Sequence, residues 1–250
     1  MAIAGRRKKR RGPEPTAAPV PLPFPEKRMR IQGVIFDLDG TVGDTLPVCF
    51  AGFREVFAAF LGVHYSDREI RGMFGPTEQG IIQRMIPGRW EEGFAAYLAA
   101  YERAHRDCPA PFPGMPELLE SLRERGIPLA IVTGKGPRSA EISLRVMGLT
   151  QYFDIVEAGS AERNVKPASM RKVVEAWGLD PKCVLSVGDA PSDIRSAKEV
   201  GLIPVAAAWA PSTDAASLGA LEPVELFDAI PPFGDWIIPR LAVGAPSRAM

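Results

Sequence analysis

The sequence has 250 residues, 46% of them hydrophobic, and its 30 basic and 30 acidic residues leave no net charge. A chain of this length can bury a sizeable core, so one α/β core with a modest insertion is a reasonable domain count. The three cysteines, Cys49, Cys108 and Cys183, are far apart and odd in number, which argues against a disulfide framework or a zinc site and predicts a reducing, cytoplasmic environment.

Residues 1–30 form a basic, proline-rich segment. They contain nine basic and two acidic residues, so this segment has a net charge of +7 and the rest of the chain −7. Six prolines between Pro13 and Pro25 and few packing groups predict a disordered tail. A basic tail could bind nucleic acid or a membrane surface. Clustered charge alone supplies no recognition geometry, so we expect no obligate nucleic-acid partner.

The run GVIFDLDGT at 33–41 places two carboxylates one residue apart where an apolar strand breaks into a turn. A strand that ends in Asp37 and Asp39 delivers these acids to the carboxyl edge of a parallel sheet, where open α/β folds bind their ligands. Gly40 then lets the backbone turn sharply away. An Asp-rich turn that only caps a helix is the alternative for this motif taken by itself.

Residues 44–110 are predicted to form a helical insertion. Apolar and aromatic residues recur at helical spacing in 48–61 and again in 94–101, which predicts two amphipathic helices that pack together. Gly72, Gly75, Pro76 and Gly80 interrupt the pattern between these helices and predict a loop.

Three further strands each end in polar groups. The strand at 127–132 runs into Thr133-Gly134-Lys135, the strand at 153–156 leads to a loop with Lys166-Pro167, and the strand at 184–187 stops at GDAPSD, residues 188–193. Helices are predicted at 139–147, 169–177 and 192–200, each followed by a glycine. This alternation predicts a doubly wound parallel α/β sheet. Lys135 and Arg138 could add positive potential, but such side chains ordinarily face water, and we expect that here.

These four strand-end motifs, in this order and spacing, resemble those of the haloacid dehalogenase (HAD) superfamily, in particular its phosphatase branch with a small helical cap. The resemblance spans about residues 31–210. It implies a Rossmann-like core at 31–43 and 111–230, the cap at 44–110, and a poorly ordered C-terminal tail at 231–250 unless Trp236 and its neighbours dock. Gly43 stands where relatives usually have a bulky aliphatic residue, which we expect to loosen the connection to the cap.

The resemblance implies that Asp37 is the nucleophile that forms an aspartyl-phosphate, with its other oxygen on Mg²⁺. Asp39 would be the general acid and base, with its main-chain carbonyl on the metal. Asp189 corresponds to the second metal carboxylate and Asp193 to the acid that supports the metal shell. Oxygen ligands of this kind suit Mg²⁺.

By the same resemblance, Thr133 and Gly134 bind the phosphoryl group and Lys166 offsets its charge. For Thr133 the alternative is a hydroxyl that caps the following helix, and for Lys166 an ordinary solvated lysine.

The expected activity is a Mg²⁺-dependent phosphatase that acts on a small phosphorylated metabolite, similar to phosphoglycolate phosphatases. A phosphoglucomutase-like phosphotransferase shares every core residue, and a non-catalytic protein that binds through its basic tail is a third hypothesis. We expect a monomer or homodimer, and no apolar stretch is long enough to span a membrane.

The cap is expected to choose the substrate, because the core handles only the phosphoryl group that all candidate substrates share. The loop at 74–79 is the predicted contact. There Thr77 and Gln79 offer hydrogen bonds, and Glu78 would repel a second anionic group. The alternative is a connection that only joins two helices.

Overall fold

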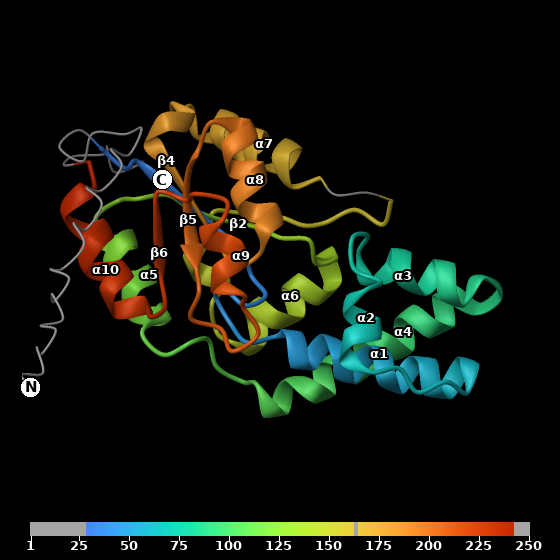
Figure 1. Ribbon diagram of the computed structural model, residues 1–250. Helices are drawn as coiled ribbons and strands as arrows, with labels where there is room; N and C mark the ends of the chain where they lie inside the picture. The colour runs from blue at the N-terminus through green and yellow to red at the C-terminus, as the bar shows by residue number, and fades with distance from the viewer. Residues whose placement is uncertain (1–28, 163–164, 243–250) are drawn as a thin grey trace, which may run out of the picture.

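A six-stranded parallel sheet forms the centre of the computed structural model, which describes residues 29–162 and 165–242 (Figure 1). The strands are β1 (Gly33–Phe36), β2 (Leu129–Val132), β3 (Ile155–Glu157), β4 (Val184–Gly188), β5 (Ile203–Ala207) and β6 (Glu225–Phe227). Their order is β3-β2-β1-β4-β5-β6, and every neighbouring pair is parallel. The predicted doubly wound α/β fold is confirmed. The predicted tail at 1–30 lies outside the described residues except for Met29 and Arg30.

Helices alternate with these strands. They are α1 (Leu46–Leu61), α2 (Asp67–Arg71), α3 (Glu78–Met85), α4 (Trp90–Ala104), α5 (Met115–Glu124), α6 (Pro137–Val146), α7 (Lys166–Trp177), α8 (Pro191–Val200), α9 (Ala215–Gly219) and α10 (Ile230–Ile237). Single 3-10 turns are η2 (Pro87–Arg89), η3 (His105–Asp107), η4 (Thr150–Tyr152), η5 (Pro181–Cys183) and η6 (Ile238–Arg240). Helices α6, α7 and α8 correspond to the three predicted after the insertion. Helix α7 begins at Lys166, which the sequence placed in a loop.

The inner strands β1, β2, β4 and β5 are buried along their whole length because helices cover both faces of the sheet, whereas the edge strands β3 and β6 are partly exposed. On β1, Val34 and Phe36 pack with α5, α6 and α10, whereas Ile35 packs with α7 and α8 on the other face. Side chains alternate across a strand, so a strand buried on both faces has no polar side. This explains why the short strands appear in the sequence as continuous apolar runs.

The strand order reverses between β1 and β4, the two central strands. Phe36 lies beside Val187, and the N–H of Asp37 extends the ladder by donating to the Val187 carbonyl at 2.9 Å. Asp37 and Asp189 therefore leave the sheet at the same edge. This reversal is the point at which open α/β sheets form a ligand crevice.

Helices α1 to α4 form a separate bundle beside the carboxyl edge of the sheet (Figure 1). The two predicted amphipathic helices are α1 and α4, and Phe53 and Tyr97 pack with ring centroids 4.7 Å apart. The predicted loop contains α3, and Gly80 lies within this helix. A side chain at Gly80 would collide with the Ala161 carbonyl of the core, so this glycine permits close docking of α3 and does not break a helix.

The predicted C-terminal tail at 231–250 does not hold for residues 231–242, because Trp236 and its neighbours dock, which is the exception that the prediction named. Phe233 and Ile237 of α10 are completely buried in the core cluster, and Trp236 packs against it. The chain then returns to Ile31, whose N–H donates to the Arg240 carbonyl at 2.9 Å and whose carbonyl accepts from Ala242 N at 2.8 Å. Residues 243–250 lie outside the described part of the chain.

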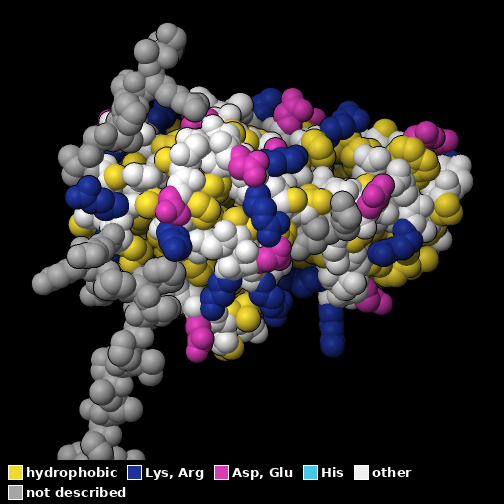
Figure 2. Space-filling view, turned by 90° about the horizontal axis from the view of Figure 1, so that it is seen from above, with side chains coloured by type: hydrophobic (Ala, Val, Ile, Leu, Met, Phe, Trp, Pro, Cys, Tyr) yellow, Lys and Arg dark blue, Asp and Glu magenta, His cyan; other side chains and the backbone are white. Residues whose placement is uncertain are grey.

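Basic and acidic side chains are interspersed on the face of the molecule seen in Figure 2. Hydrophobic side chains lie between them. Among residues 29–162 and 165–242, no helix combines the length and the apolar character needed to span a bilayer.

The docking of α10 predicts a large stability loss for Phe233→Ala. Removing this fully buried ring should lower the free energy of unfolding by about 3–5 kcal/mol. Leu226→Ala on β6, where the side chain is partly exposed, is the control and should change it by about 0.5 kcal/mol or less. Urea denaturation measures both, and equal effects of the two variants would mean that α10 is not part of the folded core.

Candidate active site

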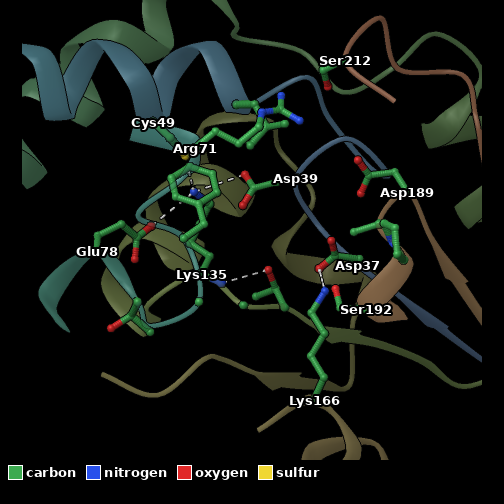
Figure 3. Close-up of a pocket in the computed structure, with 18 of the residues that line it drawn as sticks. Asp37, Asp39, Cys49, Arg71, Glu78, Lys135, Lys166, Asp189, Ser192 and Ser212 are labelled. Atoms are coloured by element: carbon green, nitrogen blue, oxygen red, sulfur yellow. Dashed lines mark hydrogen bonds and ion pairs between the residues drawn. The ribbon is translucent and has the colours of Figure 1, made fainter. Parts of the chain in front are cut away.

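A cavity of about 540 Å³ lies between the carboxyl edge of the sheet and the helical bundle. Core residues Asp37, Asp39 and Asp189 line one part of it, and cap residues including Arg71 and Glu78 line another. In Figure 3, Lys166 reaches Asp37 from one side, while Lys135 extends to Asp39 from the side of Glu78. The structure therefore brings the strand-end motifs together around one space.

The turn after β1 sets the positions of both aspartates. Gly40 has a φ of 76°, which favours glycine, and a side chain there would collide with the Asp189 carboxylate. Its N–H donates to the Gly43 carbonyl at 2.9 Å. Gly43 is itself buried, and a side chain there would meet Met147 Sδ at 2.6 Å. Gly43 is thus closely packed against Met147 in the folded chain, and the expectation that it loosens this connection stays a prediction.

Three carboxylates gather at the edge of the sheet. Oxygen atoms of Asp37, Asp189 and Asp193 lie within 4.8 Å of one another. The ammonium of Lys166, at the start of α7, forms ion pairs with Asp193 and, at 3.1 Å, with Asp37 Oδ1. The second oxygen of Asp193 accepts the Ala190 N–H at 3.0 Å. Both oxygens of Asp193 therefore have protein partners.

Positive charge is scarce around this cluster. Burial raises the pKa of Asp37 to about 7, although Lys166 lowers it, and the charges of Asp193 and Asp39 raise it further. Burial and then the charge of Asp37 raise the pKa of Asp189 well above its usual range. Crowded oxygen ligands that resist ionisation need a further cation. This donor set fits a hard, oxygen-preferring ion such as Mg²⁺.

The loop after β2 faces the same cavity. Thr133 is buried, its N–H donates to the Glu157 carbonyl at 3.0 Å, and its Oγ1 accepts the Lys135 N–H at 3.2 Å. The residue that precedes α6 is Gly136, so Thr133 does not cap this helix. Gly134 and Thr133 both line the cavity, where the hydroxyl and the open backbone can meet a ligand.

Lys135 does not face water, contrary to the expectation from its residue type. Its side chain is 1% exposed, and its ammonium lies 3.2 Å from Asp39 Oδ1 and 3.4 Å from Glu78 Oε1. Burial alone lowers the pKa of Lys135, but Asp39 and the other nearby groups outweigh it and hold this pKa well above the usual value. Arg138, by contrast, is exposed as expected.

The cap residues singled out in the sequence lie at the start of α3. Thr77 and Glu78 are buried and line the cavity, whereas Gln79 is not among its lining residues in the described part of the chain. Glu78 is paired with Lys135 and accepts the Gly136 N–H at 2.7 Å. It does not present a free carboxylate toward the cavity. Arg71 of α2 also lines the cavity, over the Phe50 ring, and was not predicted.

Comparison with known proteins identifies the family. The family model for haloacid dehalogenase-like hydrolases matches residues 34–208. The chain belongs to the haloacid dehalogenase-like hydrolase family. The predicted membership and its hydrolase class are confirmed.

Similar HAD proteins cover most of this chain. A pyrophosphatase of Halalkalibacterium halodurans is 32% identical over 70% of this chain and 82% of its own length. A phosphoglycolate phosphatase of Synechococcus elongatus is 32% identical over 72% of this chain and 84% of its own. A solved HAD-like hydrolase of Streptococcus pneumoniae superposes with a TM-score of 0.64 at 26% identity, covering 78% of this chain and 93% of the other.

The raised pKa of Asp37 predicts a pH dependence of stability without metal. Between about pH 4 and 7 the folded HAD protein holds a proton on Asp37 that the unfolded chain releases. Its stabilising effect is therefore complete at low pH and is lost as the pH rises through 7. In EDTA at pH 8, Asp37→Asn should be more stable than the wild type by on the order of 2–4 kcal/mol, and the gap should close near pH 4.

Denaturant titrations at the two pH values measure this gap. Asp154→Asn, at an exposed aspartate before β3, is the control and should show no such pH-dependent gap. A gap for Asp37→Asn that stays constant between pH 4 and pH 8 would contradict the assigned environment of Asp37.

Proposed function

We propose that this protein is a Mg²⁺-dependent phosphatase that hydrolyses a small phosphate ester through an aspartyl-phosphate on Asp37. The observation that carries the proposal is the placement of Asp37. It borders the cavity beside Lys166, and Asp39 lies two residues further on. A phosphate ester resists attack because its oxygens are negative, so catalysis depends on positioning and charge neutralisation.

In the first half-reaction, a carboxylate oxygen of Asp37 attacks phosphorus and the ester P–O bond breaks. The electron pair of that bond goes to the leaving oxygen, which takes a proton from the Asp39 carboxyl group. Thr133 and Gly134 hydrogen-bond the phosphoryl oxygens, and Lys166 offsets their charge.

In the second half-reaction, water attacks the phosphorus of the aspartyl-phosphate. Asp39, now a carboxylate, takes the proton from this water, and the bond between phosphorus and Asp37 breaks to release phosphate. Asp39 is then protonated again and Asp37 is regenerated as a carboxylate, so the cycle closes without any other proton carrier.

Asp37, Asp189 and the main-chain carbonyl of Asp39 would hold Mg²⁺, and Asp193 would support them. The engagement of both Asp193 oxygens with Lys166 and Ala190 supports this division between ligands and supporting acid. When bound, the ion neutralises charge on the phosphoryl group. The protein residues keep their own tasks, since Lys166 orients Asp37 and Thr133 orients the phosphoryl group.

The names of the relatives favour small anionic phosphate compounds as substrates, because the similar proteins include a pyrophosphatase and a phosphoglycolate phosphatase. A phosphotransferase would use the same core residues and differ in the acceptor that the cap admits. The three cysteines are free, which supports a reducing, cytoplasmic location.

Asp37→Asn should reduce Mg²⁺-dependent phosphate release to background, because an amide oxygen cannot form the acyl-phosphate at a useful rate. Phosphate release from a panel of phosphorylated metabolites, with circular dichroism to confirm folding, measures this effect. EDTA should stop hydrolysis by the wild type and added Mg²⁺ should restore it. Substantial turnover by folded Asp37→Asn would refute the nucleophile, and turnover in EDTA would refute the metal.

Asp39→Asn should slow alkyl phosphates by about 10²–10⁴-fold, the usual contribution of a general acid. The loss on p-nitrophenyl phosphate should be much smaller during phosphoenzyme formation, since p-nitrophenolate leaves without protonation. Rapid-quench measurement of phosphoenzyme formation separates this step from later hydrolysis. Equal losses on the two substrates would exclude Asp39 as the acid.

A further inference from the structure

Lys135 is a buried cation that joins the core to three cap helices. It belongs to the core loop between β2 and α6, yet its ammonium lies among cap residues. Its Nζ is 3.0 Å from Cys49 Sγ of α1, 3.4 Å from Glu78 Oε1 of α3, and 4.6 Å from the centre of the Tyr101 ring of α4. Each of these contacts depends on the cap being seated against the core.

The same ammonium holds the carboxylate of Asp39 on the core side. Lys135 Nζ lies 3.2 Å from Asp39 Oδ1, and the Thr45 hydroxyl donates to this same oxygen. Within the described residues, no hydrogen bond or ion pair involves Oδ2 of Asp39. One carboxylate oxygen is therefore fixed, and the other is left to exchange a proton.

Glu78 connects the Lys135–Asp39 ion pair to the docking of α3 on the core. Its second carboxylate oxygen accepts the Gly136 N–H at 2.7 Å, and the N–H of Thr77 donates to the Ser160 carbonyl at 3.0 Å. The start of α3 thus rests on the loop that carries Lys135 and on the neighbouring core loop at 159–161. If α3 moved away from the core, the Lys135 ammonium would lose its ion pair with Glu78.

We propose that Lys135 is a positioning residue that couples cap docking, through Glu78, to the orientation of Asp39. This inference rests on the proposed function, because it assigns the purpose of the contact to proton transfer by Asp39. Lys135 fixes Oδ1 so that Oδ2 meets the leaving group, and it does so only while the cap is seated. In this proposal Glu78 holds the Lys135 ammonium where α3 contacts the core, and it does not act by repelling substrate.

A purely structural role of the ion pair between Lys135 and Glu78 predicts a different kinetic result. If Lys135 and Glu78 only stabilised the closed arrangement, their loss would slow all phosphate esters by the same factor. A positioning role acts on proton transfer, so the loss must depend on how much the leaving group needs a proton. The choice of leaving group therefore separates the two roles.

The kinetic experiment compares Lys135→Met with Arg138→Met, a control at an exposed cation three residues further on. Phosphoenzyme formation is measured with ethyl phosphate and with p-nitrophenyl phosphate. For Lys135→Met the rate with ethyl phosphate should fall at least about tenfold more than the rate with p-nitrophenyl phosphate. Arg138→Met should leave both rates unchanged. Equal losses for Lys135→Met, or no loss, would overturn the inference.

Removing Lys135 alone leaves two carboxylates facing each other without a cation and could unfold the protein. Glu78→Gln and the double variant Lys135→Met/Glu78→Gln keep the test decisive. Glu78→Gln should cause a selective loss on ethyl phosphate, and that loss should disappear in the Lys135→Met background, because Glu78 acts through Lys135. Full additivity of the two substitutions would reject this coupling.

Amide hydrogen exchange tests, without reference to catalysis, whether Lys135 and Glu78 hold the cap against the core. In Glu78→Gln and in the double variant, exchange should accelerate at residues 77–80 and at Gly136, and remain unchanged in the core strands. Unchanged exchange at these residues would refute the docking role even in an active enzyme. If the wild type showed no Asp37-dependent hydrolysis, the proposed function would fail, and exchange alone would still decide whether Lys135 and Glu78 hold the cap.

Discussion

Buried negative charge at the carboxyl edge of the sheet is the constraint on which the rest of this structure depends. Asp37, Asp189 and Asp193 lie within 4.8 Å of one another, and ionised carboxylates taken out of water at this spacing repel strongly. Lys166 offsets part of this charge. The remainder favours a bound cation, and the proposed phosphatase chemistry would need one as well, because a phosphoryl group adds further negative charge beside these carboxylates.

The fold creates this crowding by simple means. Parallel strands end at the same edge of a sheet, so β1 and β4 deliver Asp37 and Asp189 side by side. Glycines then make room for the acids, since side chains at Gly40 and Gly188 would collide with Asp189 and Asp193. The glycines of the motifs are thus as much a part of the charge cluster as the aspartates.

The sequence predicted the features that depend on local pattern. The apolar strands, the amphipathic helices α1 and α4, and the order of the strand-end motifs were all visible in the chain, and the resemblance that they carry led to the correct family. The predicted roles of the seven core site residues remain predictions, although six of these residues line one cavity and the seventh, Asp193, pairs with Lys166 beside it.

What the sequence could not predict depends on contacts between distant segments. Lys135 was expected in water because most lysines are solvated, and only the arrival of Glu78 and Asp39 makes its burial possible. Gly80 was taken for a break, because the Ala161 carbonyl that requires it lies far along the chain. Helix α10 was missed because it is short and contains two prolines, so its apolar residues show no clear helical pattern in the sequence. Their burial depends on contacts with the core.

The two buried lysines differ in what they depend on. Lys166 pairs with Asp37 and Asp193, which are core residues, so these two ion pairs beside the proposed nucleophile lie within the core. Lys135 pairs with Asp39 in the core but also with Glu78 in the cap. A change in the cap can therefore alter the cap side of the cavity without directly breaking the Lys166 ion pairs. A change in the cap cannot disturb the start of α3 without also disturbing Asp39, the proposed general acid. Sequence variation that tunes specificity should then be tolerated more readily around Arg71, whose guanidinium lies over the Phe50 ring, than at Glu78, which pairs with Lys135.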